Sequence, residues 1–158
     1  RALLDSIESG RQLGDLENLL YRVDALVLLG SIHCFRGGVE ISYGMTYFRS
    51  AIDIQKSLLY AEEQLKTDHL KLAETLLRAA SCAAKQVDTM VASEFLEDAV
   101  QMLRSHHDIN SAMKLLDTAQ KLRASIQRDL QYMKDTATTN FVGGTIEYSR
   151  KKMKKRTL

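Results

Sequence analysis

The stretch "LKLAETLLRAASCAAKQVDTMVASEFLEDAVQML", residues 70–103, decides the fold class of this chain. It contains neither proline nor glycine and is rich in Ala, Leu, Glu, Lys and Gln, which are strong helix formers. Its apolar positions recur every three or four residues, as in one face of an α-helix. These positions are Leu70, Ala73, Leu77, Ala80, Ala84, Val87, Val91, Phe95, Ala99 and Met102. The pattern predicts a helix that reaches Arg104 unless it breaks near residues 87–89.

The rest of the chain also has a sequence typical of helices. There is no proline among the 158 residues, and all eight glycines lie outside residues 45–142. A second apolar stripe follows residue 111, and alternation typical of a strand is sustained nowhere. We therefore predict an all-α fold, an elongated antiparallel bundle of four long helices with short terminal helices. A stack of helical hairpins, as in solenoid repeats, is the alternative.

Glycine-containing segments are expected to separate these helices. Residues 9–14 ("SGRQLG") would divide a short N-terminal helix from one over about 15–34. Residues 36–44 ("RGGVEISYG") would form a loop before a helix of about 45–66. Thr67 or Asp68 would cap the helix that follows.

At the C-terminal end, residues 105–108 ("SHHD") would precede a long helix over about 109–139. Residues 138–144 ("TTNFVGG") are expected to form a turn. This divides the chain into a bundle domain, residues 1–144, and a basic C-terminal helix or tail, residues 145–158.

Composition places the chain among folded proteins, because it is 45% hydrophobic and 27% charged. The longest apolar run, "ALVLLGSIHCF" at residues 25–35, falls short of the roughly 20 residues that span a bilayer, and we expect it to be buried. Cys34 and Cys82 form no CxxC pair, and no signal peptide is visible, so we expect reduced thiols and a cytoplasmic location. Because it begins with Arg1, the chain is expected to be processed or part of a longer protein.

No motif in the sequence indicates catalysis or metal binding. His106 and His107 are adjacent and would point about 100° apart on a helix, so they would not share a metal easily. His33 lies beside Cys34, but no third group is placed to orient a Cys–His nucleophile. We therefore predict a protein that is not an enzyme and that has no cofactor and no metal.

The basic segment "SRKKMKKRTL", residues 149–158, has six basic residues and no acidic one, whereas the rest of the chain has 16 basic and 20 acidic residues. It could contact a protein partner or an anionic membrane surface, serve in nuclear import, or neutralise a few phosphates. It could also be only a solvated helix end. The acidic body and the lack of aromatic residues in the segment argue against specific nucleic-acid binding. The basic residues are Arg150, Lys151, Lys152, Lys154, Lys155 and Arg156.

Aromatic residues are dense only at "SYGMTYF", residues 42–48. Tyr43, Tyr47 and Phe48 would either plug one end of the bundle or anchor a partner, since aromatics are enriched at interface hot spots. The leading hypothesis is a non-catalytic protein–protein interaction module, a domain of a larger scaffold, trafficking or assembly protein. It would bind a partner helix or peptide in a groove between helices. The alternative is a peripheral membrane-binding bundle, like some effector or toxin domains, that uses the basic segment. Homo-oligomer formation is left open.

Overall fold

The computed structural model of the chain describes the backbone of residues 2–61, 68–86, 88–104 and 109–154, and the side chains of residues 17–59, 69–86, 88–104 and 109–136. These residues contain five α-helices and no strand. The helices are α1 (Ala2–Arg36), α2 (Glu40–Ala61), α3 (Asp68–Lys85), α4 (Thr89–Arg104) and α5 (Ile109–Lys154). The prediction of an all-α helical bundle is confirmed.

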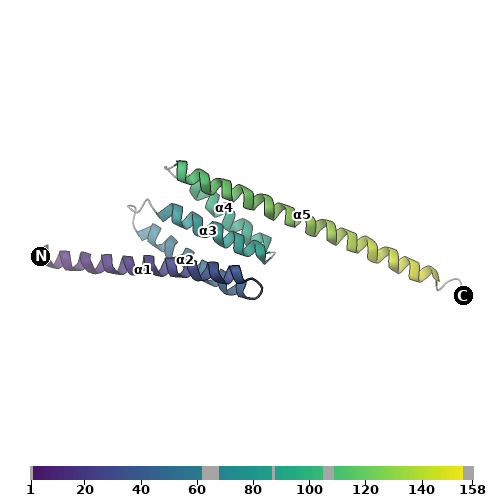
Figure 1. Cartoon of the computed structure of the whole chain (residues 1–158), viewed down its shortest axis with the longest axis horizontal. Helices are drawn as coiled ribbons and strands as arrows, with labels where there is room; N and C mark the ends of the chain where they lie inside the picture. The colour runs from purple at the N-terminus through teal and green to yellow at the C-terminus, as the bar shows by residue number, and fades with distance from the viewer. Residues whose placement is uncertain (1, 62–67, 87, 105–108, 155–158) are drawn as a thin grey trace.

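The helices are stacked in chain order. Each helix packs against the next, and α3 also contacts α1 and α5. Figure 1 shows successive helices running antiparallel, with α1 at one edge of the stack and α5 at the other. The N-terminal part of α1 and the C-terminal part of α5 project beyond the stack in opposite directions. The bundle is therefore a series of hairpins, α1–α2 and α3–α4, with α5 packed on the last.

The stack has two different sides. The odd-numbered helices touch one another, α1 against α3 and α3 against α5, whereas α2 and α4 make no contact within the described residues. The odd-numbered helices therefore lie together on one side of the stack.

The centre of the core is α3. Part of the predicted stripe is buried there, including Ala73, Leu77 and Ala80. The core is wider than one stripe, because α3 has neighbours on several sides. Also buried are Leu72, Leu76, Ala79, Cys82 and Ala83.

The long predicted helix breaks where α3 ends at Lys85 and α4 starts at Thr89. Asp88 caps α4, because its Oδ1 accepts a hydrogen bond of 3.2 Å from the Val91 N–H. Beyond the break the buried positions are Ala92, Leu96, Ala99 and Leu103, three of which lie one residue after the predicted ones, while Ala99 was predicted. The predicted positions Val91 and Phe95 are only partly buried against the core. The apolar arc of an amphipathic helix spans about 100° or more and includes both the predicted and the observed positions, so packing against neighbouring helices determines which of them are buried.

Three predicted interruptions are wrong in whole or in part. Helix α1 continues through residues 9–14, and α5 continues through residues 138–144 to Lys154. A single glycine costs an α-helix only about 1 kcal/mol, which helical neighbours can offset. The loop predicted at 36–44 is confined to Gly37–Val39, where Gly37 and Gly38 have φ of 77° and 58°. These left-handed values suit glycine and end α1.

Two helical glycines instead bring α1 and α2 together. A Cβ atom on Gly30 would lie 3.1 Å from the Phe48 ring. A Cβ atom on Gly44 would lie 2.9 Å from the Gly30 carbonyl oxygen and 3.1 Å from the Cys34 backbone nitrogen. The α1 and α2 backbones therefore approach one another where a side chain would keep them apart.

Substitution Gly44→Ala should lower the free energy of unfolding by about 1–3 kcal/mol, measured by urea denaturation. The new methyl group meets backbone atoms that cannot rotate away, which outweighs the gain of about 1 kcal/mol in helix propensity. The control Ser50→Ala, at an exposed site on the same helix, should be neutral or slightly stabilising. A Gly44→Ala variant as stable as the parent would show that α1 and α2 are not in such close contact.

Candidate functional site

The outer side of α1 carries large apolar side chains in contact with solvent. Tyr21 is 72%, Leu28 60% and Phe35 87% exposed, and Ile32 is 40% exposed. The prediction that residues 25–35 are buried is therefore wrong for much of this run. Helix α1 lies at the edge of the stack, so the stack covers only one of its sides (Figure 1).

These side chains form one continuous row. Positions 21, 25, 28, 32 and 35 are separated by alternating steps of four and three, which keeps them within about 80° around the helix. Ala25, also exposed, completes the spacing. We call Tyr21, Ala25, Leu28, Ile32 and Phe35 the α1 apolar face.

The apolar character of α1 also appears in its hydropathy. Residues Glu17–Arg36 have a mean hydropathy of 1.2 and are long and apolar enough to cross a membrane, and only 17% of the segment is buried. Core helices of soluble proteins and signal sequences pass the same test. The segment is therefore a candidate span by length and composition only.

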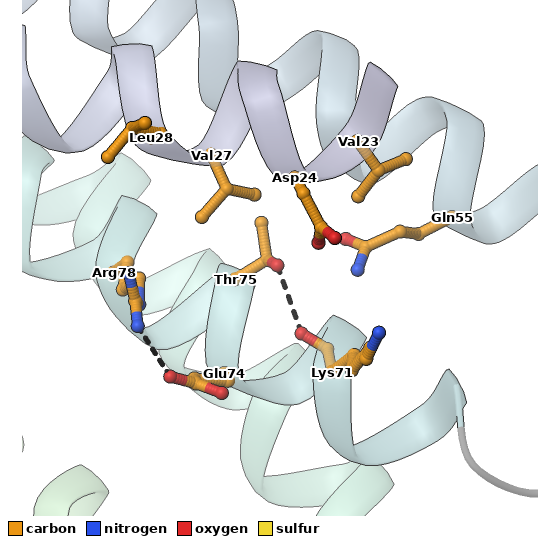
Figure 2. Close-up of a pocket in the computed structure, with 9 residues that line it drawn as sticks. All are labelled: Val23, Asp24, Val27, Leu28, Gln55, Lys71, Glu74, Thr75 and Arg78. Atoms are coloured by element: carbon orange, nitrogen blue, oxygen red, sulfur yellow. Dashed lines mark hydrogen bonds and ion pairs between the residues drawn. The ribbon is translucent and has the colours of Figure 1, made fainter. Parts of the chain in front are cut away.

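Beside this face, a groove of about 270 Å³ lies between α1 and α3. Figure 2 shows the side chains that surround it, with α1 on one side, α3 on the other and Gln55 of α2 between them. The α1–α3 groove is lined by Val23, Asp24, Val27, Leu28, Gln55, Lys71, Glu74, Thr75 and Arg78.

The groove combines an apolar wall with a charged rim. Val23, Val27 and Leu28 supply the apolar wall from α1. On α3, Arg78 Nη2 donates to Glu74 Oε1 at 2.6 Å, so these two charges compensate one another. Asp24 and Lys71 also line the groove, and neither forms a salt bridge with another described residue. The groove thus presents one acidic and one basic group for contacts with a ligand.

Two polar side chains are buried at the groove. Thr75 is 3% exposed, and its hydroxyl donates to the Lys71 carbonyl oxygen at 2.9 Å. Gln55 is 5% exposed, and its Oε1 has no hydrogen-bond partner among the described residues. A buried acceptor left without a donor costs roughly 1–3 kcal/mol. Gln55 is therefore the least satisfied polar group of this site.

Sequence reasoning missed the groove, but a signal for it was present. Gln55 stands in register with the apolar stripe of α2, because Phe48, Ile52, Gln55 and Leu59 are separated by steps of four, three and four. A polar residue at a stripe position indicates either a buried polar contact or a site. Which helix faces it could not be read from the pattern.

The three predicted aromatic anchors have different environments. Phe48 is 1% exposed and packs in the core, so it is not accessible to a partner. Tyr47 is half-buried and stacks on the His33 ring, with centroids 5.3 Å apart. Tyr43 is 60% exposed. Only Tyr43 therefore presents most of its ring to solvent.

His33 is held by groups that the sequence did not suggest. Its Nδ1 lies 2.5 Å from Glu40 Oε2, across the turn between α1 and α2. With Tyr43 and Tyr47 nearby, this contact closes the hairpin. Glu40 is thus a carboxylate positioned to orient the His33 ring, a contact that the sequence pattern did not reveal.

The two cysteines meet in the core between α1 and α3. Both are buried. Burial, the hydrogen bond with Cys34 and the electrostatic effect of Cys34, in that order, raise the pKa of Cys82 to about 12, and the charge of Lys85 opposes part of this rise. Lys85 Nζ also donates to the Cys34 carbonyl oxygen at 3.4 Å. Both side chains therefore belong to the core, and the raised pKa of Cys82 disfavours its nucleophilic thiolate.

The other candidate residues lie at the margins of the described structure. Arg150, Lys151, Lys152 and Lys154 belong to α5, while Lys155 and Arg156 lie outside the described residues, as do His106 and His107. The part of the chain with described side chains holds no group of three or more His, Cys, Asp or Glu side chains that could bind a metal ion.

No family model, curated protein or solved structure matches the chain. The site is therefore interpreted from its own geometry.

Substitution Gln55→Met should raise the free energy of unfolding by about 1 kcal/mol in urea denaturation, because it removes a buried acceptor without a partner and keeps the side-chain length. Gln120→Met, at an exposed position of α5, is the control and should change stability little. A large loss of stability in Gln55→Met would mean that a donor satisfies Gln55 in solution.

Neither cysteine should react with Ellman's reagent at pH 7.5 while the protein is folded. A thiol with a pKa of about 12 has roughly a thousandfold less thiolate than an unperturbed one at this pH, and Cys34 is buried beside it. Both thiols should react once guanidinium chloride unfolds the chain. Rapid labelling of the folded protein would contradict the packing of α1 on α3.

Proposed function

We propose that this chain is a non-catalytic protein–protein interaction module that binds a partner helix or peptide in the α1–α3 groove. The observation that carries the proposal is a groove between α1 and α3 with an apolar wall and two charged side chains, Asp24 and Lys71, that form no salt bridge with the described residues. Helix-in-groove recognition needs these components, because apolar anchors supply affinity and rim charges fix register.

The dimensions and chemistry of the groove favour a partner helix or peptide, which presents a row of side chains, over a small molecule. It is open to solvent along α3, where Lys71, Glu74 and Arg78 are exposed. A partner helix laid along it would place apolar residues against Val27 and Leu28 and polar residues toward Lys71 and Asp24. A donor from the partner could also satisfy Gln55 Oε1.

Membrane-surface binding is the second candidate function. The specific observation in its favour is the exposed apolar character of Glu17–Arg36. The six basic residues at 150–156 would add attraction to anionic lipids, and stable anchoring normally needs two such signals. The apolar segment belongs to α1, and Arg150, Lys151, Lys152 and Lys154 belong to α5.

The proposal predicts that Lys71→Glu/Arg78→Glu lowers recovery of bound partners at least about tenfold, since reversed rim charges oppose the partner they formerly attracted. The measurement is quantitative affinity capture with the chain as bait, followed by titration of the helical segment of the captured protein.

The matched control is Lys114→Glu/Lys121→Glu on α5. It makes the same charge change at the same spacing, and Lys121 pairs with the acid four residues before it, as Arg78 does. Equal losses with both variants would contradict groove recognition. Retention on anionic but not neutral vesicles, abolished by deletion of residues 149–158, would favour the membrane function instead.

A further inference from the structure

We propose that the α1 apolar face pairs with the same face of a second copy of this chain, in an antiparallel helix pair. This goes beyond the proposed groove function, because it concerns the outer side of α1 and needs no foreign partner. The face is free of the other helices of its own chain, since α1 packs only on α2 and α3 within the described residues.

The spacing of the face selects a helix as the occupant. Steps of four and three at positions 21, 25, 28, 32 and 35 give a repeat of 3.5 residues over two heptads. Such a repeat packs its side chains between those of another helix with the same spacing. A second α1 supplies that spacing without any further assumption.

Side-chain size and charge both favour an antiparallel register. In one such register, Tyr21 lies opposite Ile32 of the second copy, and Ala25 lies opposite Leu28. The layers formed by these two pairs combine a larger and a smaller side chain, as well-packed cores do, and Phe35 lies opposite the exposed Asn18 at the end of the face. The same register sets the exposed Glu17 level with Arg36 of the second copy, whereas parallel chains would set like charges level with one another.

The surface is large enough for a reversible dimer. With two aromatic rings that are 72% and 87% exposed and three smaller side chains, it covers on the order of 500 Å² per copy. A pair would then bury about 1,000 Å², which is at the lower limit of specific interfaces. We expect a dissociation constant in the micromolar range.

Sedimentation velocity of the 158-residue chain between about 1 and 200 µM tests the proposal. The parent should shift from one chain to two with concentration, and Tyr21→Glu/Phe35→Glu should weaken the dimer at least tenfold. Both residues are exposed, so the variant should keep its helical circular dichroism. The matched control Met113→Glu/Tyr132→Glu, at sites on α5 that are 61% and 71% exposed, should dimerise like the parent.

Cysteine cross-linking tests the orientation. When Ala25→Cys and Leu28→Cys chains are mixed and oxidised, antiparallel pairing gives mainly the mixed 25–28 product. Predominant 25–25 and 28–28 products would overturn the antiparallel register. The proposal would be overturned if the parent stays monomeric, or if Tyr21→Glu/Phe35→Glu leaves the dimer intact. A monomeric parent overturns it even if that monomer binds a foreign helix or vesicles.

The groove and the dimer share Leu28, but the charged rim of the groove allows them to be tested separately. Lys71→Glu/Arg78→Glu leaves the α1 apolar face untouched, so this variant should still dimerise. Loss of dimerisation in that variant would mean that the second copy occupies the groove, which overturns the placement proposed here.

Discussion

The structure depends on the small side chains of α3, the one helix that contacts all four others among the described residues. Ala73, Ala79, Ala80 and Ala83 are buried there with almost no exposure. A methyl group lets neighbouring backbones come close, so α3 can be surrounded by helices instead of facing a single partner. A larger residue at any of these positions would push one neighbour away, and the hairpins would lose their common support.

The same constraint governs α1. Gly30 and Gly44 draw α1 against α2, and Cys34 meets Cys82 of α3, so α1 is held along a narrow strip of small residues. This attachment leaves the remaining sides of the helix uncovered. Both the α1–α3 groove and the α1 apolar face follow from it, since a helix at the edge of a stack has no further neighbour. The candidate surfaces are thus consequences of how the first hairpin packs.

Local chemistry explains what the sequence could predict and what it could not. Residues 70–103 predicted helices because helix propensity and the spacing of apolar residues agree there. Gly37–Gly38 predicted a turn, and both residues have the positive φ values that favour glycine. Gly44 was placed in a loop because the sequence does not reveal which glycine packs against a neighbouring helix. Leu28 and Phe35 were expected inside because hydrophobicity alone does not say whether anything covers them. Asp24, Gln55 and Lys71 come from three helices, so only the fold brings them together.

The two edges of the stack also differ in a way that limits how copies can associate. If the outer side of α5 matched the α1 apolar face, copies could add head to tail without end. That side of α5 instead carries Lys114, Asp117 and Lys121, with Asp117 and Lys121 joined at 2.6 Å. Placing Leu28 and Ile32 against these charges would remove them from water without new partners, which is unfavourable. The α1 apolar face is therefore complementary to itself and not to the opposite edge, and such an interface closes at two copies.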